Sequence, residues 1–407
     1  MARSLTKTSQ NLVVFLLVLF CLVFPKAGFK IGTTPITFGY ILLSITFILV
    51  FILDGPRLLQ SVDKNRLLVT SLTLPFALYG LIIFYFVGYY EVGYVISFFV
   101  NFAVFPISFV YILSIRFDKL DMNYLFGMVR HSILVISIYG IFLFFYKSFT
   151  GSFIEIPYLT VNSGDLGSLE SKNISRGDYY KLISTYNNGN IYGVCLLMLL
   201  PLFDYLETGF VKRLIVRTSL ILTLSRTVWI GIFLYEIARL LLSRKRSVSF
   251  LLSSLAFFII SIYAISQILG TIGYSSDFIL DKNLGGRAES LNINPTLIPE
   301  RPFNSISEIV YASVLESFGI IGLILFSISF FSPLLIFVSS IRNNPLGAYK
   351  KRIISGIVLY MFLCFSDGAM MLIPTMLIYW FLVALLLMTQ DPLACRKKQR
   401  RLTVMTQ

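Results

Sequence analysis

The chain contains 407 residues, of which 57% are hydrophobic, 15% are aromatic and only 13% are charged, and its mean hydropathy is +0.82. Soluble proteins typically carry roughly a quarter of charged residues, so this chain has too few polar side chains to cover a surface in water. The composition excludes soluble enzymes, soluble nucleic-acid-binding proteins and disordered proteins. It predicts a polytopic membrane protein.

The net charge of +14 does not indicate a nucleic-acid partner. The basic residues form short clusters between apolar runs, as is typical of cytoplasmic loops in membrane proteins. His131 is the only histidine, which excludes His-rich metal sites, and none of the four cysteines belongs to a CxxC motif. A disulfide framework or a zinc site is therefore not expected, and we expect no metal and no cofactor.

Twelve apolar segments reach or approach the roughly 20 residues that a membrane-spanning helix requires. The first is interpreted as a helix and not as a signal peptide, because Pro25 and Lys26 follow it where a small-residue cleavage site would stand. The expected fold class is an all-α integral membrane protein with a single domain over residues 1–407. The expected helices cover residues 11–28, 36–53, 67–88, 93–114, 129–146, 190–205, 210–224, 227–243, 249–270, 308–338, 353–369 and 371–389.

Basic residues set the expected orientation of these helices. If the N-terminus is inside, every inside segment carries Lys or Arg, as the positive-inside rule predicts. An even number of helices then returns the basic C-terminus to the same side. The inside residues include Arg3, Lys7, Arg57, Lys64, Arg66, Arg116, Lys119, Lys212, Arg213, Arg244, Lys245, Arg246, Arg342, Lys350, Lys351, Arg352, Arg396 and Arg401.

Two outside segments are too long to be simple connections. Loop A covers residues 147–189, and loop B covers residues 271–307. Loop A combines Gly, Ser and Asn with four tyrosines, which favours an ordered structure. Loop B contains two adjacent glycines and three prolines, so irregular backbone with a short helix is expected.

Ionisable side chains at the outer ends of the helices are the first candidates for a functional site. Arg226 lies in Leu224–Thr227, a connection so short that the seventh and eighth helices must form an antiparallel hairpin. The arginine then lies at the outer membrane boundary. It is either an anchor at the lipid headgroups or a ligand-binding residue, and its outward position disfavours the anchor, because anchoring basic residues concentrate inside.

The end of loop A carries a second set of candidates. Arg176 and Lys181 precede Asn187–Asn190, whose Asn-Asn-Gly-Asn sequence is a turn signal directly before the sixth helix. An asparagine at such a place caps the exposed N–H groups of the helix, and a helix N-terminus flanked by cations binds anions. A solvated loop with an asparagine cap is the alternative interpretation.

Loop B and the tenth helix supply a third set. Glu308 is expected to open the helix, where it either suits the helix dipole or acts on a substrate. Glu316 follows two turns later on the same face, and a carboxylate at that depth needs a partner. Asp367 at the outer end of the eleventh helix is a similar case. The remaining candidates here are Arg287, Arg301 and Tyr311.

The outward arginines suit a diphosphate group, because a guanidinium binds phosphate through two hydrogen bonds and stays charged at any pH. They are expected to hold the diphosphate of a lipid carrier and to stabilise its charge as it leaves. Loop tyrosines offer flat apolar faces and hydroxyl groups for sugar rings. The sequence has no Walker A, Rossmann or DxD motif, which fits a lipid-linked donor better than a cytoplasmic nucleotide sugar.

Together these motifs resemble the O-antigen polymerase/ligase superfamily. The resemblance rests on Leu224–Trp229 at the start of a helix, on Asn187–Asn190, and on Glu308 with Glu316–Gly322 after a long outer loop. It covers about residues 147–325 by motif and the whole chain by topology. It implies a GT-C-like, metal-independent glycosyltransferase of the bacterial inner membrane, which acts at the periplasmic face on undecaprenyl-diphosphate-linked glycans.

Within the superfamily, the residues favour a polymerase over a ligase. The ligase pattern has a histidine in the outer loop before the Gly-Ile-Ile-Gly helix, whereas this chain reads Ser305-Ile-Ser-Glu308 there. A polymerase moves the growing glycan from its lipid diphosphate to a new lipid-linked repeat unit. By this resemblance Glu308, Arg226 and Arg287 are catalytic, with Glu308 as the base unless diphosphate departure alone drives the reaction. The substrate-binding candidates are Arg176, Lys181, Asn187, Asn190, Arg301, Tyr311 and Glu316.

Two other functions remain as alternatives, an O-antigen ligase and a flippase or transporter of lipid-linked sugars. Transporters of about twelve helices tend to have short outer loops and polar residues at mid-membrane, whereas this chain has two long outer loops and charges at the outer boundary. The expected partners are membrane lipid and the lipid-linked oligosaccharide, with a chain-length regulator and a flippase in the same pathway.

Overall fold

The computed structural model describes residues 14–31, 34–46, 64–113, 122–171, 175–176, 179–241, 295–341 and 347–388, together with Leu12, Ile48 and Ile52. The expected ninth helix, the first part of loop B and Arg287 lie outside these residues.

The described chain is mostly helical, and several of its helices are long and apolar enough to cross a membrane. They are α3 (Lys64–Phe86), the run Val92–Val110, residues Asn123–Thr150 of α6 (Met122–Thr150), α8 (Gly189–Leu206) and residues Val310–Leu335 of α12 (Val310–Ile341). This agrees with the expectation of a helical, membrane-embedded protein. The chain continues from α8 into α9 (Phe210–Ile221) and α10 (Arg226–Leu241), and from α12 into α13 (Ala348–Leu363) and α14 (Thr375–Leu386).

The fourth expected helix is continuous but irregular. It consists of α4 (Val92–Phe99) followed by two π-helical stretches, η2 (Val100–Val104) and η3 (Pro106–Leu113). Wider turns of this kind suit a proline inside a helix, because Pro106 has no N–H to donate to the preceding turn. Asn101 lies in this irregular stretch with its side chain buried, and its Nδ2 donates to the carbonyl oxygen of Met370 at 3.3 Å.

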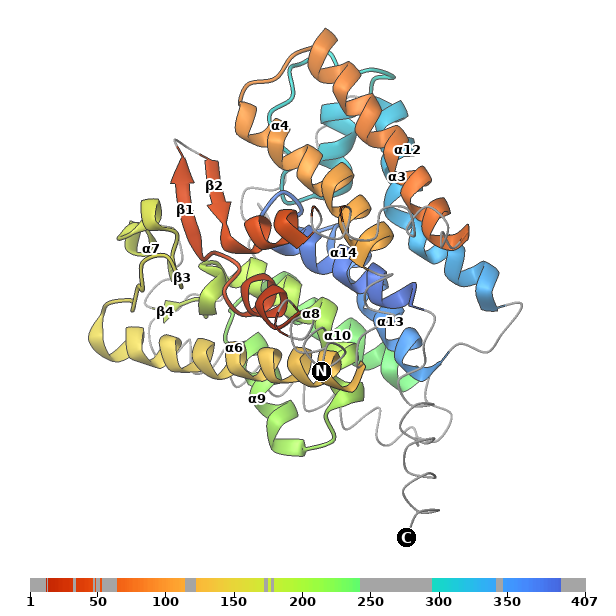
Figure 1. Cartoon of the computed structure of the whole chain (residues 1–407). Coiled ribbons are helices and arrows are strands. Elements are labelled where there is room, and N and C mark those ends of the chain that lie inside the picture. The colour runs from red at the N-terminus through yellow and green to blue at the C-terminus, as the bar shows by residue number, and fades with distance from the viewer. Residues whose placement is uncertain are drawn as a thin grey trace, which may run out of the picture.

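The first expected helix ends at Val23, five residues earlier than predicted, and two small hairpins accompany the helices. The helix ends with η1 (Leu19–Val23), and β1 (Gly28–Ile31) then pairs antiparallel with β2 (Thr34–Thr37). A second hairpin, β3 (Ser175–Arg176) with β4 (Tyr179–Tyr180), lies in loop A beside α7 (Ser168–Ser171). Figure 1 shows both hairpins at the same side of the molecule, with β3 and β4 close to one end of α6.

A buried lysine holds loop A against the end of α6. The Lys147 side chain at the end of α6 is 4% exposed and lies 4.7 Å from the ring centre of Phe153 and 4.6 Å from that of Tyr180. Its Nζ also lies 3.4 Å from a Glu170 carboxylate oxygen. A lysine over aromatic faces is attracted by their negative quadrupoles. Loop A therefore packs onto the end of α6 as a folded segment.

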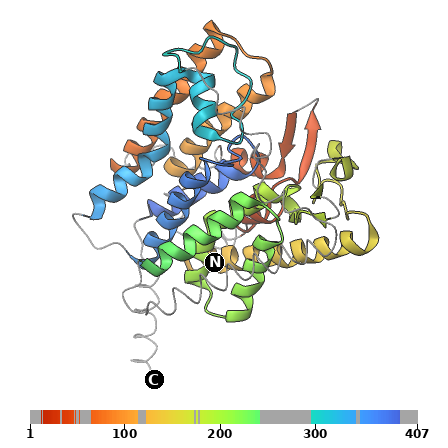
Figure 2. The same ribbon diagram turned by 180° about the vertical axis from the view of Figure 1, so that it is seen from behind.

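The tenth expected helix is not a single helix, and the prediction was wrong on this point. Gly319 has φ 68° and ψ −174°, which interrupts α12. The Tyr311 ring stacks 6.4 Å from the Phe331 ring, although 20 residues of straight helix would separate them by about 30 Å. The segment before Gly319 therefore folds back along the segment after it, as the adjoining cyan helices in Figure 2 show.

The break in α12 is closed by neighbouring segments. The N–H of Ile320 donates to the Thr296 carbonyl oxygen at 2.9 Å, and the Tyr79 hydroxyl donates to that of Phe318 at 3.1 Å. A Cβ on Gly319 would lie 2.5 Å from the carbonyl oxygen of Leu297. Only glycine fits both the dihedral angles and this close approach. The end of loop B is thereby fixed against the turn of α12.

Two features dominate the hydrophobic core, a cluster of phenylalanine rings and the buried helix α8. Phe76, Phe84, Phe98, Phe303 and Phe318 join α3, α4, α12 and the end of loop B, with the rings of Phe98 and Phe318 stacked at 5.2 Å. The central helix α8 is buried along most of its length and packs against α13, α10 and α14. Small residues let these backbones approach closely.

Candidate functional site

The Ser366–Gly368 turn joins the starts of three helices. It lies in the non-helical connection between α13 and α14, where Asp367 is only 2% exposed. The Asn190 Nδ2 donates to the Asp367 Oδ2 at 2.6 Å, and the Ser366 and Thr227 hydroxyls lie 3.0 Å apart. The N–H of Gly368 donates to the Glu308 carbonyl oxygen at 2.9 Å. The turn thus connects to the first residues of α8 and α10 and to the segment before α12.

The start of α8 has the cap that its sequence predicts. The Asn188 side chain accepts hydrogen bonds from the N–H groups of Asn190 at 2.8 Å and Ile191 at 3.2 Å. Asn187 has φ 58°, a left-handed conformation that asparagine tolerates better than most residues. The preceding chain packs on the α9–α10 connection, since the Leu182 N–H donates to the Leu222 carbonyl oxygen at 3.0 Å.

Arg226 is the first residue of α10. Four residues separate it from α9, and Leu224 within them has φ 49°. The indole N–H of Trp229 donates back to the Ile221 carbonyl oxygen at 3.0 Å, which secures this short turn. The Arg226 side chain is half-buried. The Thr227 hydroxyl contacts the Ser366 hydroxyl. Arg226 precedes Thr227 and Asp367 follows Ser366, so both adjoin this contact.

Glu308 lies two residues before α12 and its side chain is exposed. Two backbone hydrogen bonds fix this segment. The Gly368 N–H donates to the Glu308 carbonyl oxygen, and the Val310 N–H donates to the Cys364 carbonyl oxygen at 3.0 Å. The start of α12 is further fixed by Ser313, whose Oγ accepts the Ser307 N–H at 2.8 Å. The carboxylate of Glu308 is therefore accessible on a fixed backbone.

Glu316 does not have the surroundings that the sequence predicted for it. A straight helix would have carried it two turns into the bundle on the same face as Glu308. The side chain is instead exposed, three residues before the break at Gly319. The fold-back of α12 changes its position, so Glu316 is not a carboxylate buried in the interior of a long helix. Tyr311 is half-buried, and its hydroxyl donates to the Met361 carbonyl oxygen at 2.9 Å.

The remaining candidates lie around this turn or elsewhere. Lys181 is 9% exposed, and a Cβ on Gly189 would lie 3.0 Å from its Cβ, so it adjoins the start of α8. Arg301 is exposed, two residues before Phe303, whose backbone pairs with the α3–α4 connection. Arg176 lies in β3 of loop A. The structure therefore links Asn190, the residue after Arg226 and the backbone of Glu308 to one turn, whereas Arg176 and Arg301 lie in other segments.

Sequence reasoning gave too little weight to the α13–α14 connection. Asp367 was treated only as a case similar to Glu316, and Ser366 and Thr227 were not singled out for themselves. The available signal was Ser-Asp-Gly between two apolar segments, with Pro374 soon after it. An ionisable residue in a break between two apolar segments is a functional candidate by default. Such a break with a carboxylate in it is therefore a candidate for function.

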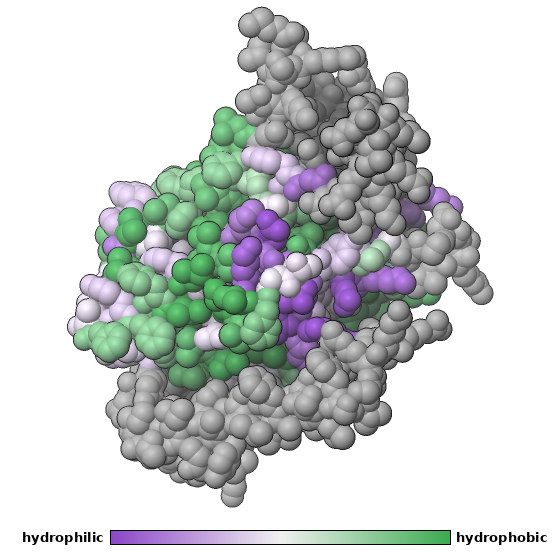
Figure 3. All heavy atoms as spheres, turned by 90° about the horizontal axis from the view of Figure 1, so that it is seen from below, coloured by the Kyte–Doolittle hydropathy of each residue, from purple (hydrophilic) through white to green (hydrophobic). Residues whose placement is uncertain are grey.

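A second polar cluster lies at the other end of α8. Asp204 accepts hydrogen bonds from Arg217 at 2.8 Å and from the Tyr235 hydroxyl at 2.8 Å, and Arg217 also contacts Glu236 at 2.7 Å. This explains an arginine in the apolar seventh segment, because charges between helices are tolerated when they are paired. Figure 3, which views the side where α6 and α9 lie in Figure 1, shows polar residues gathered beside a broad apolar surface.

Glu207 completes this end of the molecule. Its carboxylate accepts the N–H of Gly209 at 2.9 Å and lies 3.1 Å from the Lys212 Nζ. The backbone hydrogen bond, with the neighbouring Lys212 and Arg130, lowers the pKa of Glu207 below its usual range despite burial. Glu207 is thus held as an anion within a basic region, which suits the expected inside face.

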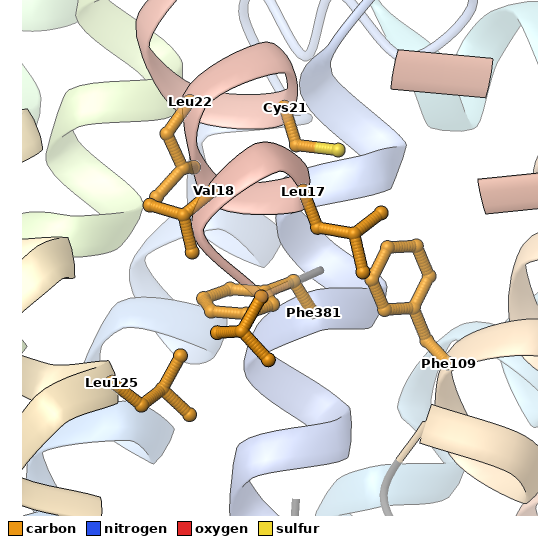
Figure 4. A pocket seen from close by; sticks show the side chains of 8 residues that line it. Leu17, Val18, Cys21, Leu22, Phe109, Leu125 and Phe381 are labelled. Carbon is orange, nitrogen blue, oxygen red and sulfur yellow. The ribbon is translucent and has the colours of Figure 1, made fainter. Parts of the chain in front are cut away.

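An apolar pocket lies away from the candidate site. It is lined by Val14, Leu17, Val18, Cys21, Leu22, Phe109, Leu125 and Phe381, as Figure 4 shows. These side chains offer no hydrogen-bond donor of the strength that a phosphate or a sugar requires. The pocket is therefore not where charged or polar substrate groups would bind.

Comparison of the chain with protein-family models gave no match, and comparison with curated proteins gave none either. An arginine beside the starts of α8, α10 and α12 favours an anion, because helix N-termini carry partial positive charge. Glu308, whose carbonyl oxygen is bound to the same turn, carries an exposed carboxylate that can accept a proton.

Proposed function

We propose that this protein is an O-antigen polymerase, a glycosyltransferase of the bacterial inner membrane with its active site facing the periplasm. In this proposal the chain has a GT-C-like topology of twelve membrane helices with both termini in the cytoplasm. It transfers the growing glycan from undecaprenyl diphosphate to a new undecaprenyl-diphosphate-linked repeat unit. It works with a flippase and a chain-length regulator and uses neither a metal nor a cofactor.

The observation that carries the proposal is the meeting of three helix starts at the Ser366–Gly368 turn. Two of these helices begin with the motifs that resemble the superfamily, Asn190 on α8 and Arg226 on α10, and Glu308 precedes the third. Residues that are far apart in the sequence thus share one end of the bundle. Their chemistry suits a diphosphate leaving group beside an acceptor hydroxyl.

The proposed roles follow from the charge of each group. Arg226, together with Arg287 of loop B, holds the diphosphate and stabilises the charge that develops as the glycosyl bond breaks. Glu308 accepts the proton of the attacking hydroxyl. Asn190 contacts the glycan, and Lys181 and Tyr311 contact the glycan or the diphosphate from the surrounding elements. The other proposed substrate contacts are Arg176, Asn187, Arg301 and Glu316.

Deletion of the gene in its source bacterium tests the proposal. The lipopolysaccharide should then carry one repeat unit on the core, and restoring the gene should restore long chains. Bare core would indicate a ligase or a flippase instead. Those two differ in whether lipid-linked repeat units reach the periplasmic face, which an impermeant glycan-labelling reagent distinguishes. Unchanged lipopolysaccharide in the deletion strain would contradict all three functions.

A further inference from the structure

We propose that Asp367 is a positioning residue whose carboxylate orients the side-chain amide of Asn190, so that the amide oxygen binds a hydroxyl group of the glycan. This inference rests on the polymerase function proposed above and adds a sugar-binding contact to it. It separates two parts of the site, because Arg226 binds the diphosphate and Asn190 binds the sugar.

The orientation of the Asn190 amide follows from its partner. Asp367 is 2% exposed and its Oδ2 lies 2.6 Å from the Asn190 Nδ2. An ionised carboxylate can only accept hydrogen bonds, whereas an amide has a donor nitrogen and an acceptor oxygen. The nitrogen must therefore face Asp367. A hydroxyl partner would permit either orientation of the amide, because it can both donate and accept, whereas a carboxylate oxygen that accepts selects the amide nitrogen.

The opposite end of the amide is an acceptor that lacks a donor. The Asn190 Oδ1 is enclosed and has no hydrogen-bond partner within the part of the chain that the structure describes. Burying an acceptor without a partner costs free energy, which is regained when a donor binds. A sugar hydroxyl supplies such a donor, whereas a diphosphate has only acceptor oxygens. The hydroxyl reaches Oδ1 by displacing the groups that cover it.

The helix start does not need the Asn190 side chain for its own capping. The Asn188 side chain already accepts the N–H groups of Asn190 and Ile191. The Asn190 amide therefore has no local structural partner to satisfy in the first turn of α8. Its partner lies 177 residues further along the chain, in the turn that also contacts Thr227 and supports Glu308. A hydroxyl bound at Asn190 would lie close to both proposed catalytic groups.

The test compares two ligands of the purified full-length protein by thermal shift. One is undecaprenyl diphosphate, and the other is the same carrier bearing the oligosaccharide extracted from the source bacterium. Wild-type protein should bind the glycan-bearing lipid more tightly. Asn190→Ala and Asp367→Ala should weaken its binding about tenfold, the usual scale of one hydrogen bond, while binding of the bare lipid stays unchanged. Arg226→Ala should weaken binding of both lipids.

Two double variants separate positioning from stability. Because Asp367 acts through Asn190, the Asn190→Ala/Asp367→Ala protein should bind the glycan-bearing lipid as Asn190→Ala does. The exchange Asn190→Asp/Asp367→Asn retains one donor and one outward oxygen, and should restore binding. Ser219→Ala is the matched control, since it removes the 2.7 Å hydrogen bond that Tyr192 of the same helix donates. It should lower thermal stability without changing the difference between the ligands.

The possible results distinguish this inference from the function beneath it. If Asn190→Ala binds both lipids as wild type does, or if the effect of Asp367→Ala adds to that of Asn190→Ala, the positioning role is wrong and the polymerase proposal stands. If wild-type protein binds neither lipid, both proposals are wrong. Loss of the glycan-dependent difference in both single variants, with recovery in the exchange variant, supports the inference.

Discussion

Arg226 shows how the position of a single side chain bears on function. It begins α10, is half-buried and lies one residue from the contact between Thr227 and the Ser366–Gly368 turn. An anchor at the lipid headgroups needs only a positive charge. A diphosphate ligand needs the planar fork of the guanidinium, which makes two parallel hydrogen bonds. The two interpretations therefore differ in whether lysine can replace arginine.

We predict that Arg226→Lys abolishes long-chain polymer in vivo at normal protein level. Removing one such charge-stabilising donor typically lowers a rate about 100-fold or more. The measurement is the lipopolysaccharide ladder of the deletion strain expressing the variant, with membrane content checked by immunoblotting. Lys351→Arg, on an exposed position of α13, is the matched control and should leave the ladder unchanged. A full ladder from Arg226→Lys would make Arg226 an anchor.

Glu308 provides the second prediction at this scale. A general base contributes about 100- to 10,000-fold in rate, whereas a charge near a helix N-terminus contributes only about 0.3–1 kcal/mol to stability. Glu308→Gln should therefore reduce polymerisation of lipid-linked repeat units by purified protein at least 100-fold with almost unchanged thermal stability. Glu316→Gln, at another exposed glutamate, should have a smaller effect. Activity of Glu308→Gln within about threefold of wild type would mean that the reaction needs no protein base.

Among the elements, α12 has the largest effect on where the candidate residues lie. The sequence around Gly319 is as apolar as any spanning helix, yet the chain reverses there and closes the break with the carbonyl oxygen of Thr296 and the hydroxyl of Tyr79. The short first segment thereby places its start at the Ser366–Gly368 turn. There the Glu308 carbonyl oxygen accepts the Gly368 N–H, so Glu308 adjoins the turn that Asn190 and Thr227 also contact.

We expect Gly319→Ala to destabilise the protein by about 1–3 kcal/mol, since its dihedral angles are nearly confined to glycine. The added Cβ would also meet the Leu297 carbonyl oxygen at 2.5 Å. Thermal unfolding of the purified variant measures the loss. Gly127→Ala is the control, because a Cβ at that helical position in α6 meets no atom within 4 Å and should be neutral or stabilising. Equal thermal stability of both variants would contradict the strain at Gly319.

At the scale of the whole molecule, the two ends of α8 differ in chemistry. One end meets the Ser366–Gly368 turn, and the other end carries the cluster of Asp204, Arg217 and Glu236 together with Glu207 and Lys212. The basic residues of the second end match the expected cytoplasmic side. The orientation of the entire bundle then follows from which end faces outward.

Cysteine labelling tests this orientation. A cysteine at Leu166, exposed in loop A, should react with an impermeant thiol reagent in cells with a permeabilised outer membrane. A cysteine at Lys212 should react only after the inner membrane is opened. Both are placed in a background without Cys395, whereas Cys21, Cys195 and Cys364 are buried and need not be replaced. Labelling of the Lys212 position before that of Leu166 would reverse the proposed topology.

The sequence alone determined that the chain is rich in apolar helices of membrane-spanning length and where several of these helices lie. Hydropathy and charge suffice for this, because a span of apolar residues is a local property of the chain and does not depend on its neighbours. The Asn188 cap of α8 and the short α9–α10 turn at Arg226 were likewise readable, since both depend on a few adjacent residues.

The tertiary structure decided which of these residues meet. The hydrogen bond between Asn190 and Asp367 joins positions 177 residues apart, and no local pattern specifies that pairing. The reversal at Gly319 depends on carbonyl oxygens of the segment that ends loop B, so the sequence predicted one long helix over residues 308–338 where the structure has two segments. Long-range contacts of this kind arise from packing between helices that are far apart in the sequence. Local sequence patterns therefore do not predict them.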